Sequence, residues 1–327
     1  MTQPKVSIII LNWNGKKYLQ KCLDSVFNIN YKNYEVLLVD NASTDDSVDF
    51  VKKRYQNKIK SKKLKLILND KNYGYAEGNN RGIKYATGTF ILFLNQDTYV
   101  DKDFLSILVE YAKKHKNVGI CGPKILDYNN PKLIQSIGGE LDFFGSPYRI
   151  KFGEIDTDHT EKETRPKIVS WIQGSCLLIK KSLLKKLKYC FDPDFFAYFE
   201  EIDLCWRASL VGYDVVVIPK AKIYHKGNPN ISEKLIFYTS RNKVLSFRKN
   251  LSPLLRIIFL PIIFIRGFIA LIFWYMKGKL SLKYIFPYFS SLFIKINPDV
   301  NLKNIPYSKQ LKIFRRPKIK KYLSLFK

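Results

Sequence analysis

Residues 90–97 read Phe-Ile-Leu-Phe-Leu-Asn-Gln-Asp, and this stretch decides the fold. Five consecutive apolar residues are typical of a strand that is buried on both faces of a sheet. The run stops abruptly at Asn95-Gln96-Asp97. In an open α/β sheet the carboxyl ends of the strands face the ligand crevice, where a carboxylate can hold a divalent cation against a phosphate. A solvated turn in which Asp97 caps the next segment is the alternative that these eight residues leave open.

The segments around this strand alternate between strand and helix patterns. Such an alternation predicts a parallel sheet with right-handed crossovers, and therefore an α/β fold. The strands before the crevice end at Asn12, Asp40 and Asp97, so these polar side chains are expected at one edge of the sheet. The expected elements of the first half are strand 6–11, helix 16–28, strand 35–40, helix 48–55, strand 65–68, a polar loop 69–82 that leads into a helix ending near Ala86, strand 90–94 and helix 101–116. They are followed by strand 118–122, a hairpin or loop 133–152, strand 169–179 interrupted at Gly174, helix 182–189, and strands 215–218 and 223–225.

Two nucleotide-binding classes are excluded by the turns. The first strand is followed by Asn-Trp-Asn-Gly, where a dinucleotide fold would carry GxGxxG, and the sequence contains no GxxxxGK[ST] phosphate loop. The five cysteines stand singly and form no CxxC pair, so neither a zinc ribbon nor a disulfide framework is indicated. Together with an N-terminus that lacks a secretory pattern, this predicts a reducing, cytoplasmic location.

The net charge of +28 is distributed unevenly. Residues 231–327 carry 20 lysines and arginines but only two acids, so this region contributes +18 of the total. Such asymmetry predicts an anionic partner, either a membrane surface or a nucleic acid. The basic residues lie beside long apolar runs, which favours the membrane, and no nucleic acid partner is expected.

The basic region contains the almost wholly apolar stretch 254–276, which is interrupted by Pro261 and Arg266. The charge-free stretches 257–265 and 267–276 are each too short to span a bilayer, which needs ~20 residues. A pair of part-inserted interfacial helices, with Arg256 and Arg266 snorkelling to the surface, is therefore expected. A true membrane span and a buried core or dimer helix are the alternatives.

Six segments, in order, carry a family resemblance: VSIIILNWNG, VLLVDNASTDDS, NYGYAEGNNRGI, FLNQDT, FDPDFFAYFEEIDLCWR and IYHKG. Over residues 5–245 the sequence resembles the family 2 glycosyltransferases, and most closely a rhamnosyltransferase-like branch that builds bacterial surface polysaccharides. The resemblance implies a GT-A fold, a mostly parallel sheet flanked by helices. It predicts a catalytic domain at 1–230, with a nucleotide-sugar half at about 1–115 and an acceptor half at about 116–230, followed by a basic helical membrane-binding region at 231–327.

The resemblance also implies the residues that would bind the donor. Asn12 and Asp40 match positions near the base and ribose, although Asp40 could equally be a turn or helix-capping acid. The glycines of the following loop let the backbone approach a ligand closely, or simply form a connection. The implied donor-side residues are Asn12, Asp40, Asn41, Asn72, Gly74, Asn79, Asn80, Asn95, Gln96 and Arg207.

Asn95-Gln96-Asp97 stands where the family has an acidic metal motif. In this sequence Asn95 replaces the first acid of that motif, which leaves Asp97 as the carboxylate ligand. His225 matches a late histidine that completes the metal site in some members. One or two carboxylates plus substrate phosphates suffice for Mg²⁺, whereas an imidazole ligand favours Mn²⁺. A structural or surface role is the alternative for His225.

The start of a later helix matches the family's general base. Inverting transfer needs a carboxylate to take the proton of the acceptor hydroxyl. Glu201 is the expected base and Glu200 the second candidate, with Asp203 beside them. Asp203 and Arg207 are spaced i, i+4, so they predict either a helix-surface ion pair or an arginine that faces the diphosphate. Trp171 and Gly174 match the acceptor side.

The sequence therefore predicts an inverting transferase that moves a sugar from a nucleotide-diphosphate donor to a lipid-linked or cell-surface glycan. The branch implies rhamnose as one candidate sugar. The enzyme is expected at the inner face of the cell membrane, held peripherally. A basic nucleic-acid-binding protein and a catalytically inactive GT-A-like scaffold remain the alternatives.

Overall fold

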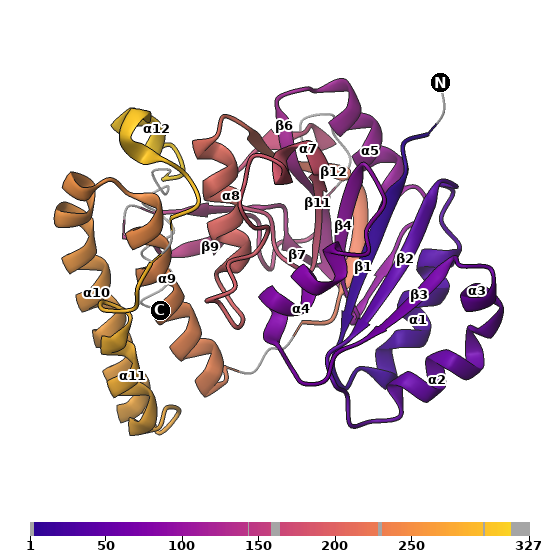
Figure 1. The fold of residues 1–327 in the computed structure, drawn as a ribbon, viewed down its shortest axis with the longest axis horizontal. Helices are drawn as coiled ribbons and strands as arrows, with labels where there is room; N and C mark the ends of the chain where they lie inside the picture. The colour runs from indigo at the N-terminus through magenta and orange to yellow at the C-terminus, as the bar shows by residue number, and fades with distance from the viewer. Residues whose placement is uncertain (1–2, 143, 158–163, 228–230, 297, 315–327) are drawn as a thin grey trace.

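The computed structural model describes residues 3–142, 144–157, 164–227, 231–296 and 298–314. A ten-stranded sheet in the order β10-β12-β6-β11-β4-β1-β2-β3 forms the centre of these residues, with β5 paired to β12 and β7 to β6 (Figure 1). A separate hairpin of β8 and β9 lies within the segment expected to be a hairpin or loop. The strands are β1 (Val6–Asn12), β2 (Tyr34–Asp40), β3 (Leu64–Leu68), β4 (Phe90–Asn95), β5 (Thr98–Val100), β6 (Val118–Asp127), β7 (Ile134–Ser136), β8 (Gly139–Leu141), β9 (Pro147–Arg149), β10 (Lys167–Ile168), β11 (Cys176–Lys180) and β12 (Asp214–His225).

Helices cover both faces of the sheet. Alternate residues of β1 enter different cores, because Ile9 packs in one hydrophobic cluster whereas Ile8 and Ile10 pack in the other. The arrangement confirms the α/β fold. The helices are α1 (Lys16–Phe27), α2 (Ser47–Arg54), α3 (Gln56–Lys60), α4 (Gly74–Ile83), α5 (Phe104–Lys114), α7 (Lys181–Leu184), α8 (Glu200–Leu210), α9 (Glu233–Asn250), α10 (Pro253–Met276), α11 (Ile285–Ser290) and α12 (Tyr307–Gln310), with 3₁₀ turns at Leu282–Tyr284 and Leu302–Asn304.

The first half of the sheet has the predicted parallel topology. Strand β1 lies between β2 and β4, parallel to both, and β3 continues the parallel array from β2. The second half is mixed, because β11 runs antiparallel to β4 and β6 whereas β12 is parallel to β6. The strands of the first half therefore end together at the edge where Asn12, Asp40 and Asn95 lie.

One strand prediction needs correction, and another is confirmed in part. Strand β12 is continuous through Pro219, where two strands were expected. Its pairing with β6 shifts register between Ile218 and Lys222, and this bulge accommodates the proline. The interruption predicted at Gly174 is present as a turn, and β11 begins after it at Cys176. Before the turn, Trp171 forms only an isolated bridge with Gly139.

The loop expected over residues 69–82 is in large part helix α4. Its glycines lie against the sheet: a Cβ at Gly78 would stand 2.8 Å from Leu11 Cδ1, and one at Gly82 would stand 2.8 Å from Ile9 Cγ2. Glycine lowers helix propensity, which made the segment look like a loop, but here it allows the helix to lie close to β1.

The C-terminal helices form one side of the molecule, beside the end of the sheet remote from β3 (Figure 1). Helix α9 shares the main hydrophobic core, since Val244, Leu245 and Phe247 are fully buried. The apolar stretch is one continuous helix, α10, rather than the expected pair, with Pro261 inside it. Its length and mean hydropathy of 2.5 would allow it to cross a membrane, and only 17% of its most apolar window is buried. Residues 315–327 of the predicted membrane-binding region lie outside the described residues.

Candidate active site

A pocket of about 560 Å³ lies at the carboxyl ends of β1 and β4. It collects residues from the parallel half of the sheet, from helices α1 and α4, from the segment before α8 and from the start of α9. Six predicted site residues line it, namely Asn41, Asn72, Gly74, Asn95, Gln96 and Asp97. The other lining residues are Leu11, Trp13, Tyr18, Tyr75, Phe196, Ala197, Tyr198, Ser232, Lys234 and Tyr238.

Asn12 and Asp40 are buried together behind the pocket. Asn12 Nδ2 donates to Asp40 Oδ1 over 2.7 Å, and the same carboxylate accepts from the backbone N–H and hydroxyl of Ser43 at 2.9 and 2.6 Å. The carboxylate therefore organises the turn after β2, as the turn-acid alternative expected. A contact of Asp40 with a nucleotide stays a prediction.

Asn41 ties the end of β2 to helix α4. Its Nδ2 donates to Asn72 Oδ1 at 3.0 Å and to the carbonyl of Gly74 at 2.9 Å. Gly74 has φ +73°, and a Cβ there would stand 2.1 Å from the carbonyl oxygen of Phe196. Glycine alone fits this close approach, which lets the N–H of Tyr75 bond to Phe196 at 2.7 Å. The contact joins the start of α4 to the segment that precedes Glu200 and Glu201.

Asp97 and His225 face each other, with 3.4 Å between Asp97 Oδ1 and His225 Nε2. Antiparallel pairing of β5 and β12 places Thr98 opposite His225, and this register brings the two side chains together. Burial opposes the ionisation of Asp97, but the hydrogen bond and charge of His225 outweigh it, so the pKa of Asp97 lies below its usual value. A carboxylate and an imidazole are suitable ligands for a divalent cation whose coordination a substrate phosphate would complete. Among the described residues, no cluster of three or more His, Cys, Asp or Glu side chains could hold a metal by itself.

Gln96 lines the pocket and forms hydrogen bonds with the turn that follows β1. Its Oε1 accepts from the N–H of Trp13 at 2.7 Å, and its Nε2 donates to the carbonyl of Trp13 at 3.1 Å. These bonds hold Trp13 at the rim of the pocket with half of its surface exposed. Sequence reasoning missed Trp13; its position directly after the polar end of the first strand was the available signal.

Glu200 and Glu201 begin α8, directly after Tyr198 and Phe199, which have φ of 69° and 74°. Two consecutive left-handed residues without glycine represent backbone strain of the kind that gathers at functional sites. In the part of the chain that is described, Oε2 of each glutamate is buried without a hydrogen-bond partner. Burial raises the pKa of Glu201 to about 7, and burial and the charge of Glu201 raise the pKa of Glu200 well above its usual range.

The predicted ion pair of Asp203 and Arg207 forms, but it is fully buried instead of lying on the helix surface. Arg207 Nε donates to Asp203 at 2.7 Å, and its terminal nitrogens donate to Asp299 at 2.9 Å and to the carbonyl of Cys190 at 2.6 Å. Asp203 also accepts bonds from α9. The guanidinium thus points into the protein because α9 and the segment around Asp299 cover this side of α8, and this placement is incompatible with a diphosphate ligand.

Several predicted residues do not line the pocket, namely Asn79, Asn80, Trp171 and Gly174, and also Glu200, Glu201 and His225. Asn79 Nδ2 donates to the carbonyl of Tyr75 at 2.9 Å, and Asn80 bonds to both backbone groups of Phe191. Trp171 is buried and donates to the carbonyl of Glu140 at 3.2 Å. Gly174 accepts from the hydroxyl of Tyr75 at 2.6 Å, so it reaches the pocket only through that ring.

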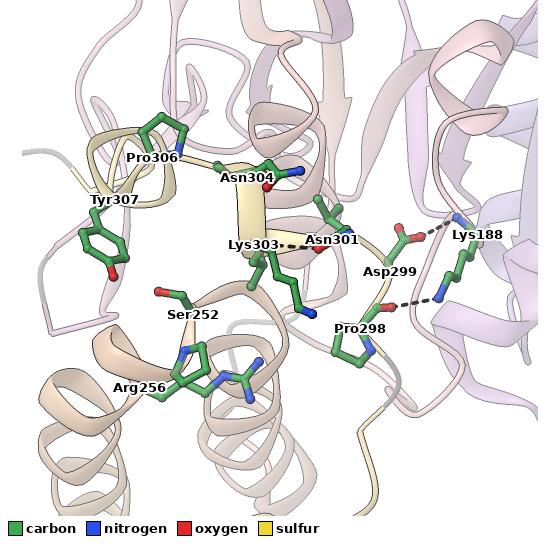
Figure 2. A pocket seen from close by; sticks show the side chains of 14 residues that line it. Lys188, Ser252, Arg256, Pro298, Asp299, Asn301, Lys303, Asn304, Pro306 and Tyr307 are labelled. Carbon is green, nitrogen blue, oxygen red and sulfur yellow. Dashed lines mark hydrogen bonds between the residues drawn. The ribbon is translucent and has the colours of Figure 1, made fainter.

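A larger cavity of about 1040 Å³ lies elsewhere, between the start of α10 and residues 298–307. Figure 2 shows Lys188 bonded to Asp299 and to the carbonyl of Pro298 on one side of it, and Tyr307 on the other. None of the predicted site residues lines this cavity.

Comparison with known proteins matches residues 7–188 to the model of glycosyl transferase family 2. The chain is 26% identical over 216 residues to the poly-beta-1,6-N-acetyl-D-glucosamine synthase of Staphylococcus epidermidis, a match that covers 66% of this chain and 48% of that protein, so the chain spans about half of its length. It is 25% identical over 241 residues to the N-acetylglucosaminyl-diphospho-decaprenol L-rhamnosyltransferase of Mycobacterium tuberculosis, covering 67% and 75%. The structure of GalNAc-T7 with UDP, GalNAc and Mn²⁺ superposes with a TM-score of 0.62 at 18% identity, covering 75% of this chain and 48% of that one, a likeness of fold.

Proposed function

The chain belongs to glycosyl transferase family 2 and is a glycosyltransferase, and from this premise we propose that it is an inverting, metal-assisted enzyme that transfers a sugar from a nucleotide diphosphate to a lipid-linked glycan. One observation carries the proposal. One pocket is lined by Asp97, which His225 faces at 3.4 Å, and by the strained segment at Tyr198 that leads into Glu200 and Glu201. Asn41 and Asn95, at the ends of β2 and β4, line the same pocket.

Asp97 and His225 would hold a divalent cation, Mg²⁺ or Mn²⁺, which neutralises charge on the departing diphosphate when it is bound. GalNAc-T7, which shares the fold, was crystallised with Mn²⁺ and UDP. Lys234 carries the positive charge among the described residues that line the pocket. It lies in the first turn of α9, so we assign to Lys234 the diphosphate contact that Arg207 cannot make.

Glu201 takes the proton of the acceptor hydroxyl. The acceptor oxygen then attacks the anomeric carbon from the face opposite the diphosphate, and the bond between that carbon and the phosphate oxygen breaks. A base with a pKa of about 7 is matched to this work near neutral pH. Burial and the charge of Glu201 also raise the pKa of Glu200 well above its usual value, and Glu200 is the second candidate for the base.

A donor panel tests the site. The relatives transfer rhamnose or N-acetylglucosamine by name, so UDP-, dTDP- and GDP-sugars with Mn²⁺ should be compared by thermal shift. At least one donor should raise Tm, and Lys234→Gln should reduce the rise. Lys186, which follows α7, is exposed and does not line the pocket. Lys186→Gln is therefore the matched control and should leave the shift intact. A panel in which no donor raises Tm would contradict the proposal.

We also place the enzyme at the inner membrane surface, through α10. One face of this helix is buried at Leu255, Ile263, Gly267 and Leu271. The opposite face is exposed, with Ile257 at 73%, Ile265 at 55% and Ile269 at 60%. Arg266 lies within α10, and Lys277 and Lys279 directly follow its end, so an apolar face and cationic side chains occur together, which suits an interfacial helix on anionic lipid. The relative that acts on a decaprenol-linked acceptor supports a lipid-linked substrate here.

Vesicle co-sedimentation tests this placement. The full chain should sediment with vesicles that contain phosphatidylglycerol and less with neutral vesicles. The double variant Ile257→Asp/Ile265→Asp should stay in the supernatant, whereas Ser290→Asp, outside the exposed α10 face, should still sediment. Release from the vesicles by carbonate would separate peripheral binding from a true span. Retention of DNA without lipid binding, at matched salt, would favour the nucleic-acid-binding alternative.

A further inference from the structure

We propose that Gln135 is a positioning residue that fixes the tautomer of His225, so that Nε2 presents its lone pair toward Asp97. The inference rests on the proposed metal-assisted transfer. It assigns a function to β7, a short strand whose side chains the sequence analysis left without a role. Gln135 is buried, at 8% exposure, and lies 90 residues from His225 in the chain.

Two hydrogen bonds set the orientation of the Gln135 amide. Its Nε2 donates to the backbone carbonyl of His225 at 3.1 Å, and its Oε1 lies 2.6 Å from His225 Nδ1. A backbone carbonyl can only accept, so the amide nitrogen must face it and the amide oxygen must face the ring. That oxygen can also only accept. Nδ1 therefore carries a hydrogen in either charge state of the ring. The protonated ring also donates from Nε2 to Asp97, which, against the effect of burial, lowers the pKa of that carboxyl, whereas the neutral ring keeps the Nε2 lone pair for a cation.

A neighbouring side chain reinforces this arrangement. Gln173 Nε2 donates to the same Gln135 oxygen at 3.2 Å, which occupies its second acceptor position. Gln173 Nε2 also lies 3.4 Å from His225 Nδ1, but Gln135 Oε1, at 2.6 Å, is the closer partner of that nitrogen and accepts its hydrogen. A histidine that ligates a metal through one nitrogen is commonly held in this way through the other.

The free nitrogen points to where a cation is needed. His225 Nε2 lies 3.4 Å from Asp97 Oδ1, and neighbouring ligands of an octahedral cation with bonds of roughly 2.1 Å stand about 3 Å apart. Asn95 Nδ2, also 3.4 Å away, can donate to the same lone pair in the metal-free state. Because Asn95 replaces the first acid of the metal motif, His225 is one of only two proposed protein ligands. The tautomer of His225 should therefore strongly affect the affinity for the cation.

The test uses Mn²⁺ alone, added to the full chain without any donor. Mn²⁺ binding is followed by electron paramagnetic resonance, and the tautomer is read from ¹⁵N shifts of the three histidines, with His225→Ala to assign the signal. Gln135→Met removes both hydrogen bonds at similar volume, and should lower Mn²⁺ affinity by about 10- to 100-fold and populate the Nε2–H tautomer. Gln135→Glu keeps an acceptor for Nδ1–H, and should restore the tautomer and most of the affinity.

Gln173→Met is the matched control, because it leaves the bond between Gln135 and His225 in place and should retain the Nδ1–H tautomer. Circular dichroism at the assay temperature confirms that each variant is folded. Two results would overturn the inference: an Nε2–H tautomer in the wild-type chain, or Mn²⁺ affinity in Gln135→Met equal to that of the wild type. Failure of the proposed function would appear separately, as a chain that binds Mn²⁺ through His225 but recognises no nucleotide sugar.

Discussion

Replacing Glu201 by glutamine should abolish transfer while making the protein more stable at alkaline pH. Burial raises the pKa of this carboxyl from 4.5 to about 7 on folding. A raised carboxyl pKa means that the folded state holds the proton more tightly, so stability is lost as pH rises through the folded pKa. At roughly 1.4 kcal/mol per pH unit, the ionised Glu201 costs about 3 kcal/mol at pH 8 and nothing below pH 4.5. Glutamine has a similar shape and no charge, so it avoids this cost.

Urea unfolding at pH 5 and pH 8 measures the stability difference, and multiple-turnover transfer measures activity. The free energy of unfolding of Glu201→Gln should exceed that of the wild type by up to about 3 kcal/mol at pH 8, and the difference should shrink toward zero at pH 5. Transfer should fall by about 10²- to 10⁴-fold, the usual contribution of a general base. Glu200→Gln is the comparison, because it should retain the activity that depends on Glu201. Two results would refute this reasoning: a Glu201→Gln enzyme that still catalyses transfer, or a gain in the free energy of unfolding that is the same at pH 5 and pH 8.

A pH profile of the wild type and three further substitutions test the base, the metal ligand and two packing contacts. The kcat/KM of the wild type should rise with pH through about 7 as Glu201 loses its proton, and a profile flat from pH 5 to pH 9 would count against this base. Asp97→Ala should remove the part of donor affinity that depends on Mn²⁺, and calorimetry that finds unchanged affinity would refute its metal role. Arg207→Met should lower the free energy of unfolding by about 3–5 kcal/mol, because Asp203 and Asp299 lose a buried partner, and an unaffected denaturation midpoint would contradict this. Gly74→Ala should cost about 1–3 kcal/mol, given its φ of +73°, and a stability equal to that of the wild type would show that the contact with Phe196 is easily relieved.

The parallel half of the sheet was readable from the sequence because its signals are local. The run from Phe90 to Leu94 is fully apolar and completely buried between β1 and β11, and such runs identify central strands. The polar residues at the strand ends also converge as predicted, since parallel strands that start on one side must end together on the other. Asp97 and His225 meet because β5 and β12 pair, which the family resemblance anticipated and composition did not.

Non-local packing accounts for most of what the sequence reading missed. The glycines of α4 weaken a helix pattern in isolation, and only the contact with Ile9 and Leu11 explains them. The buried state of Arg207 depends on Asp299, which is 92 residues away in the chain. The link between Gln135 and His225 spans 90 residues and has no periodic signature. Helix α10 was divided at Arg266 by its charge, whereas the backbone continues through that residue.

Hydrolysis of nucleotide sugars by the full chain, with and without Mn²⁺, tests the central claim most directly. Purified wild-type chain should release the nucleoside diphosphate from at least one donor of the UDP, dTDP and GDP series when Mn²⁺ is present. Asp97→Ala should reduce that release to the level seen without metal. Wild-type chain that hydrolyses no donor, or an Asp97→Ala chain that hydrolyses its donor as fast as the wild type, would contradict a metal-assisted sugar transfer in this pocket.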